Sequence, residues 1–325
     1  MRTTTTLTVF LAGLLGAAVG FGQDPLSLRV DVSLVTLDAE VTDSAGRPVT
    51  TLTKEDFQIY ENGTLQDLRS FDSVETPYNI LLLFDCSPST QPDWPFLVEA
   101  MNRFRHMLRP QDRMELAQFG GGFKVLQKWF FQAGQAIDVE VQPNNQVCWG
   151  TNFYGALSQA IDELKTVKGR KGVVVLSDGG HDRIPFQSGN RTPLGRPRYV
   201  DSVDDKDFQR IHRSVAGADV VFYFVAVNTD LNPDEFNTED IYNKQQLRSR
   251  IEVLASASGG RVVFPKKPDE VVKLYEQLAH DLGTSYSLGY VPANPARDGT
   301  YRKIEVRLRD HSLRVRQSRE GYRAQ

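Results

Sequence analysis

The sequence predicts an α/β fold: a doubly wound, mostly parallel sheet with helices on both faces, joined to a small β-sandwich-like unit. Strand-length apolar runs alternate with amphipathic stretches through the middle of the chain, the pattern of a parallel sheet covered by helices. Both ends of the chain change to an alternation of apolar and polar residues with period two, which is typical of half-buried antiparallel strands.

Composition places the chain among ordinary globular proteins, with 325 residues, 40% hydrophobic and 24% charged. This length predicts one medium domain with a smaller one. The formal net charge of -3 gives no general attraction to nucleic acid or to anionic membranes. We therefore expect no nucleic-acid partner.

Residues 1–22 have the features of a secretory signal peptide: a basic start, an apolar segment over residues 7–19, and small residues before Gln23. The alternative is a membrane anchor, but the apolar segment is shorter than the roughly 20 residues that span a bilayer. We expect an exported protein, periplasmic or secreted, with no membrane span after cleavage.

Residues 25–76 are predicted to form an N-terminal β segment. Its alternation changes phase once, at Leu34 and Val35, which suggests a β-bulge. Asn62-Gly63 predicts a hairpin turn, and Thr53 begins a short capped turn. The segment is too short to bury a core by itself.

Residues 77–284 are predicted to form the central α/β domain, after a boundary at Pro77. Its expected helices are residues 96–108, 153–164, 206–215, 247–258 and 269–282, and its expected strands are 80–84, 114–119, 123–131, 173–177, 220–227 and 261–264. Residues 184–203 and 228–243 are expected to be long irregular loops. These loops either determine binding specificity or are solvent-exposed and have no partner, and the sequence leaves both alternatives open.

Residues 285–325 return to period two and form a C-terminal β segment. The arginines along it, among them Arg302 and Arg316, are interpreted as the solvated face of a sheet. Neither terminal segment can build a core alone. We therefore expect residues 285–325 to pack with residues 25–76 in one sandwich, with the central domain inserted between them.

Five oxygen-bearing side chains follow predicted strands or open a predicted helix. They are Asp85, Ser87, Ser89, Thr151 and Asp178. Open α/β sheets bind ligands outside the carboxyl ends of their strands, where these segments would meet. Asp and Ser are also ordinary turn residues, so the first three alone are weak evidence. Hydroxyl and carboxylate oxygens favour Mg²⁺ or Mn²⁺ over Zn²⁺, which prefers nitrogen and sulfur.

The ordered pattern Asp-x-Ser-x-Ser, then Thr, then Asp resembles the metal-ion-dependent adhesion site (MIDAS) of von Willebrand factor type A (VWA) domains. The resemblance covers roughly residues 77–284, and the flanks resemble exported bacterial VWFA-related proteins first grouped from acidobacteria. It implies that Ser87, Ser89 and either Thr151 or an Asp ligate the cation directly, while the others act through water. Cys86 and Pro88 depart from the small residues usual between these positions.

The resemblance implies an adhesion-type protein-binding module, not an enzyme, in which a partner's Asp or Glu carboxylate completes the metal's coordination. We expect the protein to be monomeric or weakly associating. His181, Arg183 and Arg191 follow Asp178 and are candidates for a partner-binding loop. One alternative is a metal-dependent hydrolase with His181 as its base, although turn-forming neighbours favour an exposed loop position for this residue. Another is a metal-free extracytoplasmic scaffold.

The two cysteines, Cys86 and Cys148, lie in two of the candidate site's segments. Export permits a disulfide, which would hold the walls of the site together if the segments converge. Two small buried apolar side chains are the alternative.

Overall fold

The computed structural model describes residues 34–131, 146–191, 197–229, 231, 238–265, 270 and 279–324. The predicted signal peptide, the strand residues before Leu34 and most of the helix expected over 269–282 lie outside these ranges. Among the described residues, no helix combines the length and hydropathy needed to cross a bilayer.

A six-stranded sheet forms the centre of the α/β domain, in the order β12-β11-β8-β5-β6-β7. Its strands are β5 (Tyr78–Asp85), β6 (Arg113–Phe119), β7 (Phe123–Phe131), β8 (Arg170–Ser177), β11 (Val221–Ala226) and β12 (Val262–Val263). All pair in parallel except β7, which runs antiparallel to β6. Every residue of β5 is buried, as expected for an apolar strand covered on both faces. The predicted fold class is confirmed.

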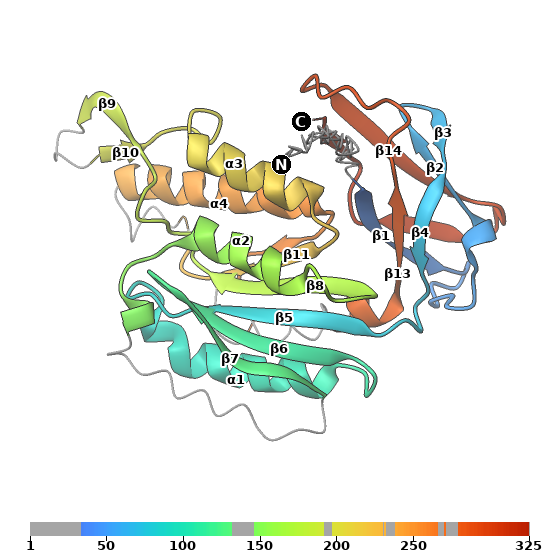
Figure 1. Ribbon diagram of the computed structural model, residues 1–325, viewed down its shortest axis with the longest axis horizontal. Coiled ribbons are helices and arrows are strands. Elements are labelled where there is room, and N and C mark those ends of the chain that lie inside the picture. The colour runs from blue at the N-terminus through green and yellow to red at the C-terminus, as the bar shows by residue number, and fades with distance from the viewer. Residues whose placement is uncertain are drawn as a thin grey trace, which may run out of the picture. The chain divides into compact units, whose positions relative to one another are not determined.

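Helices cover both faces of this sheet (Figure 1). The helix α1 (Trp94–Met107) packs on one face through Leu97, Met101 and Phe104. The other face is covered by α2 (Phe153–Leu164), α3 (Lys206–Gly217) and α4 (Thr238–Ser258). Asn152 caps α2 and Asp205 caps α3 through side-chain oxygens, which accept backbone N–H groups that have no partner within the helix.

Parts of the two segments that were expected to be irregular loops form a helix and strands, so the predicted extent of both loops was wrong. Helix α4 begins at Thr238, inside the loop expected over 228–243. The segment 184–203 contains a hairpin of β9 (Phe186–Arg191) and β10 (Pro197–Tyr199). Polar composition concealed both elements, because tertiary packing overrides weak local propensity.

Strands from the two chain ends pair in two four-stranded sheets, β15-β1-β13-β4 and β16-β14-β2-β3. The strands are β1 (Val35–Thr42), β2 (Phe57–Glu61), β3 (Thr64–Gln66), β4 (Leu68–Asp72), β13 (Ser285–Tyr290), β14 (Tyr301–Leu308), β15 (Arg314–Gln317) and β16 (Gly321–Arg323). One apolar cluster joins residues from both ends, including Leu37, Ile59 and Tyr286. The predicted hairpin turn is present, with positive φ at Asn62 and Gly63.

Buried residues lie on both faces of β1, although its sequence alternates. Leu37 and Ala39 point into the sandwich core. Asp38, on the other face, accepts hydrogen bonds from Tyr223 Oη at 2.6 Å and Tyr78 Oη at 3.2 Å. These tyrosines belong to strands of the central sheet, so β1 contacts both parts of the fold.

Candidate metal centre

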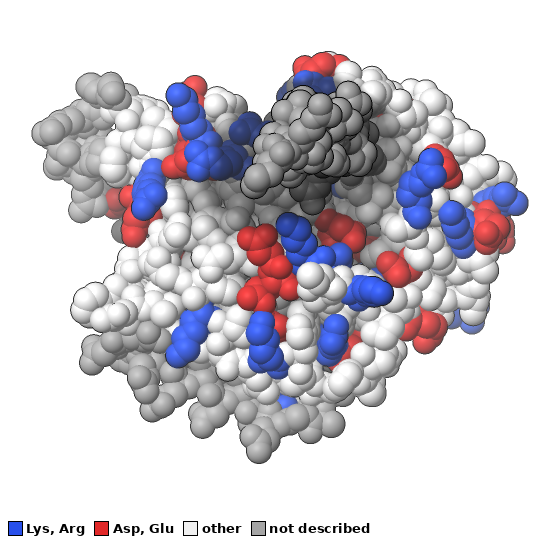
Figure 2. Space-filling view, viewed as in Figure 1, with Lys and Arg blue, Asp and Glu red and all other residues white. Residues whose placement is uncertain are grey.

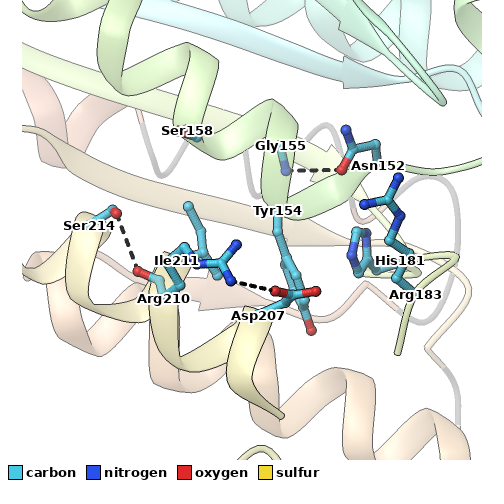
Figure 3. Close-up of a pocket in the computed structure, with 10 residues that line it drawn as sticks. All are labelled: Asn152, Tyr154, Gly155, Ser158, His181, Arg183, Asp207, Arg210, Ile211 and Ser214. Carbon is cyan, nitrogen blue, oxygen red and sulfur yellow. Dashed lines mark hydrogen bonds and ion pairs between the residues drawn. The ribbon is translucent and has the colours of Figure 1, made fainter. Parts of the chain in front are cut away.

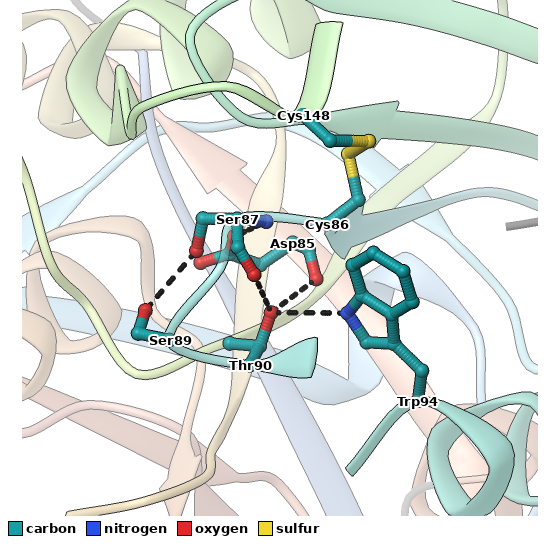
Figure 4. The surroundings of a disulfide bond; sticks show 7 residues. All are labelled: Asp85, Cys86, Ser87, Ser89, Thr90, Trp94 and Cys148. Carbon is teal, nitrogen blue, oxygen red and sulfur yellow. Dashed lines mark hydrogen bonds between the residues drawn. A yellow bond between two sulfur atoms is a disulfide. The ribbon is translucent and has the colours of Figure 1, made fainter. Parts of the chain in front are cut away.

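Asp85 ends the central strand β5 and is fully buried. Its Oδ1 accepts a hydrogen bond from the Ser87 backbone N–H at 2.9 Å, and its Oδ2 accepts one from Ser177 Oγ at 2.6 Å. Ser87 Oγ and Ser89 Oγ lie 3.2 Å apart (Figure 4). The first three candidate ligands therefore lie together in one tight turn.

Thr90 fixes this turn, a role that the sequence reasoning missed. Its buried Oγ1 lies 2.8 Å from the Asp85 carbonyl oxygen and 3.0 Å from that of Ser87, and it accepts a hydrogen bond from Trp94 Nε1 at 3.3 Å (Figure 4). Its position directly after the Asp-x-Ser-x-Ser pattern was the available signal, since hydroxyl residues often bond nearby backbone groups.

Asp178 follows β8, the parallel neighbour of β5, so its segment reaches the same sheet edge as Asp85. Its Oδ1 accepts the Gly180 N–H at 2.8 Å, which shapes the turn. Ser177, just before it, donates to Asp85. The sequence reasoning missed this serine, although its place at the strand end was visible.

Thr151 is held at this edge by Asp182, another residue that the sequence reasoning missed. The Thr151 N–H donates to Asp182 Oδ2 at 2.7 Å, and the Asp182 N–H donates to the Thr151 carbonyl at 2.9 Å. These bonds tie the segment around Thr151 to the segment that follows Asp178. No hydrogen bond joins the Thr151 side chain to the other four candidate ligands, all of which the structure describes.

Cys86 and Cys148 form a disulfide, with Cα atoms 5.0 Å apart (Figure 4). Both cysteines are buried. The bond joins the turn that carries Ser87 to the segment that leads into Thr151. The Ser87 turn and the Thr151 segment are therefore linked covalently. Paired hydrogen bonds link the Thr151 segment to the segment that follows Asp178.

The end of a third strand, β11, also contacts the site. Asn228, just after β11, has φ 53° and donates from Nδ2 to the Ser89 carbonyl oxygen at 3.1 Å. Asn tolerates this left-handed conformation better than most residues. A lone Asn after a strand is common in turns, so the sequence offered little to single it out.

Two neighbouring carboxylates, those of Asp85 and Asp178, dominate the electrostatics of the site. Burial, and then the nearby Asp178 charge, raise the pKa of Asp85 to about 7. Among the described residues, no Lys or Arg forms an ion pair with Asp85 or Asp178. Within the described ranges, no three or more His, Cys, Asp or Glu residues are grouped so that they could hold a metal ion. The candidate set has only two carboxylates, and its other three donors are hydroxyls. These donors fit a hard divalent cation.

His181 is buried, so its expected exposed position was wrong. Its ring packs 4.1 Å from the ring of Tyr154, and burial lowers the pKa of its imidazole. The Tyr154 contact is tertiary, so turn-forming neighbours in the sequence gave no indication of it.

A cavity of about 250 Å³ lies between α2, α3 and the segment that follows Asp178 (Figure 3). His181 and the exposed Arg183 line it, together with Asn152 and Asp207. Of the three residues expected in a partner-binding loop, two therefore line one cavity. The side chain of Arg191 lies outside the described residues.

No protein-family model matches the chain, and no match is found among curated protein sequences. Similar solved structures include a von Willebrand factor type A protein from Catenulispora acidiphila, at 13% identity and a TM-score of 0.44, covering 90% of this chain and 74% of that one. Another is the pilus adhesin SpaC from Lactobacillus rhamnosus GG, at 10% identity and a TM-score of 0.45, covering 86% of this chain and 49% of that one.

A third is proximal thread matrix protein 1 from the mussel byssus, solved with a zinc-occupied MIDAS motif. It is 15% identical with a TM-score of 0.44, and the match covers 67% of this chain and 48% of that one. This chain thus spans about half the length of the adhesin and of the byssus protein.

Proposed function

We propose that residues 77–284 form a VWA-type domain inserted between the two terminal β segments, and that the chain is a metal-ion-dependent protein-binding module. Mg²⁺ or Mn²⁺ would be held by Asp85, Ser87, Ser89, Thr151 and Asp178. The observation that carries the proposal is the fully buried Asp85 beside Asp178, with no basic side chain paired to either among the described residues. Burying such a charge is costly unless a cation compensates it.

The donor set explains why a partner's carboxylate would bind. Three of the five side chains are neutral hydroxyls, so the protein supplies less negative charge than a site built of carboxylates. Mg²⁺ keeps water in part of its octahedral shell. An Asp or Glu from a partner can replace such a water and supply the missing charge.

We propose binding rather than catalysis. A metal-dependent hydrolase needs a base or nucleophile beside the ion. His181, the histidine nearest in sequence to the candidate ligands, packs against Tyr154 and lines the cavity between α2 and α3. Packing against Tyr154 explains the position of the His181 ring.

The disulfide supports an extracytoplasmic location, periplasmic or secreted, because such bonds persist in oxidising compartments. Figure 2 shows acidic and basic side chains interspersed over the described part of the viewed face. This mixture gives no general attraction to polyanions, and we propose a specific protein contact made by a monomer.

Cation titration tests the proposal. Thermal unfolding of the wild type and of Asp85→Asn is followed with rising Mn²⁺ or Mg²⁺, and bound Mn²⁺ is counted by electron paramagnetic resonance. We expect a rise in unfolding free energy of about 2.7 kcal/mol for the wild type at a hundredfold excess over Kd. Asp85→Asn should show little rise.

The matched control is Asp310→Asn. Asp310 also accepts the N–H two residues ahead, from Ser312 at 2.9 Å, in an exposed turn remote in sequence from the candidate ligands. It should respond to cations as the wild type does. A wild type that binds no Mn²⁺ would refute the metal site and leave the metal-free scaffold.

A further inference from the structure

Trp149 is an exposed aromatic residue beside the candidate metal centre. Its relative exposure is 65%, whereas the buried Trp94 has 8%. Leaving so much apolar surface in water forgoes the stabilisation that burial would give. Single exposed apolar residues are common, so the argument depends on where Trp149 lies and how firmly it is held.

The backbone on both sides of Trp149 is fixed. Cys148, the preceding residue, is bonded to Cys86. Thr151, two residues later, is paired with Asp182 through two hydrogen bonds. The segment also packs closely on the turn after β6, where a Cβ added to Gly121 would lie 2.0 Å from the Trp149 carbonyl oxygen. The indole is therefore presented from a rigid support.

Chain geometry places this support at the rim of the site. Two residues span at most about 7 Å, so the Trp149 Cα lies within that distance of the Thr151 Cα. Cys148 is joined to the residue between Asp85 and Ser87. Trp149 therefore lies on the segment that brings Thr151 to the site, one residue from the disulfide that joins this segment to the Ser87 turn.

We propose that Trp149 determines specificity by packing against an apolar side chain that lies within two residues of the partner's acidic residue. This inference rests on the proposed function. The partner is then a protein loop with an Asp or Glu beside a Leu, Ile, Val, Met or Phe, and not a merely acidic surface. Exposed aromatic residues on rigid supports contribute strongly to binding, because they bury large areas at little entropic cost.

The test selects ligands from random peptides, so the natural partner need not be identified first. Phage displaying disulfide-constrained random peptides are bound to the full chain in Mn²⁺ and eluted with EDTA, so that only metal-dependent binders are sequenced. Three proteins are compared: the wild type, Trp149→Ser and the control Leu65→Ser. Leu65 is similarly exposed, at 56%, but lies on β3 of the terminal β unit.

For the wild type and Leu65→Ser, we expect enrichment of Asp or Glu with an apolar residue within two positions. For Trp149→Ser, the acidic residue should stay enriched and the apolar preference should disappear. In fluorescence anisotropy, one enriched peptide should bind Trp149→Ser about tenfold more weakly, and Trp149→Phe should recover most of the affinity. The Mn²⁺ affinity of all variants should match that of the wild type, which a loss of loop structure would not allow.

The failures can be told apart. Acidic peptides enriched without an apolar neighbour, or a Trp149→Ser selection identical to that of the wild type, would overturn this inference and leave the metal-dependent function standing. Absence of any EDTA-eluted acidic peptide from the Mn²⁺-loaded wild type would overturn the proposed function and the inference with it.

Discussion

Several polar residues of this protein are buried, and the alternation of inward and outward positions along a strand identifies some of them. The sequence interpretation makes Arg302 a solvated residue, but it is 2% exposed and lies 3.1 Å from Glu61. Arg302 shares its phase along β14 with the buried Ile304 and Val306, so period two already indicated the inward face. The interpretation failed because it weighted charge above phase, although a buried Arg is tolerated when it is paired.

Asp85 should make the metal-free protein less stable as pH rises. Its pKa is about 7 in the folded chain against an ordinary value of 3.8, so between these values the folded state holds a proton that the unfolded state has lost. The stabilisation is complete below about pH 3.8 and is lost as pH rises through about 7, by up to about 1.4 kcal/mol per pH unit. Chemical unfolding in EDTA across this range measures it.

Asp85→Asn serves as the control for this pH dependence, because its amide does not titrate. Its unfolding free energy should lack the fall expected for the wild type between the ordinary pKa of 3.8 and the raised pKa of about 7. Addition of Mn²⁺ to the wild type should recover stability above the raised pKa, where the carboxylate is ionised. A wild-type profile that matches that of the variant would contradict the assignment.

At the scale of elements, the candidate centre is built from three segments that are fastened to one another. The disulfide joins the Ser87 turn to the Thr151 segment, and Asp182 joins the Thr151 segment to the segment that follows Asp178. Three consecutive glycines, residues 120–122, follow β6 beside these segments. A Cβ at Gly120 would lie 2.6 Å from the Val147 carbonyl oxygen, so the absence of a side chain there permits close backbone packing.

Removal of the disulfide should weaken both the fold and the site. The bond closes a sequence separation of 62 residues, and a loop of this size predicts a loss of about 2–4 kcal/mol in Cys86→Ser/Cys148→Ser. We also expect weaker Mn²⁺ binding, because the Ser87 turn is no longer fixed to the Thr151 segment. Calorimetry and Mn²⁺ titration check the two effects.

Reductant gives the corresponding control on the wild type. Reduction should lower its melting temperature towards that of the double variant, and the double variant itself should not respond to reductant. Equal Mn²⁺ affinity in the oxidised wild type and the double variant would show that the disulfide supports stability alone.

For the molecule as a whole, the terminal β unit and the central sheet share a buried polar junction at Asp38. Its carboxylate accepts from Tyr223 and Tyr78 of the central sheet and from Ser287 Oγ of β13, the last at 2.5 Å. Arg319, also buried, donates from Nη1 to the Ala257 carbonyl oxygen at 2.7 Å. These contacts couple residues from both ends of the chain to the domain between them.

Asp38→Ala should cost about 2–5 kcal/mol, because it leaves buried tyrosine hydroxyls without an acceptor. Glu40→Ala is the matched control on the same strand, since its ion pair with the exposed Arg316 should contribute about 0–1 kcal/mol. Denaturant unfolding followed by both Trp fluorescence and circular dichroism measures the loss. Equal stability of the two variants would show that the junction does not hold the parts together.

The sequence by itself determined the α/β class, most element positions and the five candidate ligands, because these follow from local periodicity and from residues placed at strand ends. Helix α2, for instance, has the predicted bounds. Only the tertiary structure decided which contacts hold the site in place, those of Thr90, Asp182 and Asn228. It also decided the burial of His181 and the burial of Asp38 on the second face of β1. Each depends on which side chains meet across long separations in sequence, and neither hydrophobic pattern nor local propensity encodes that directly.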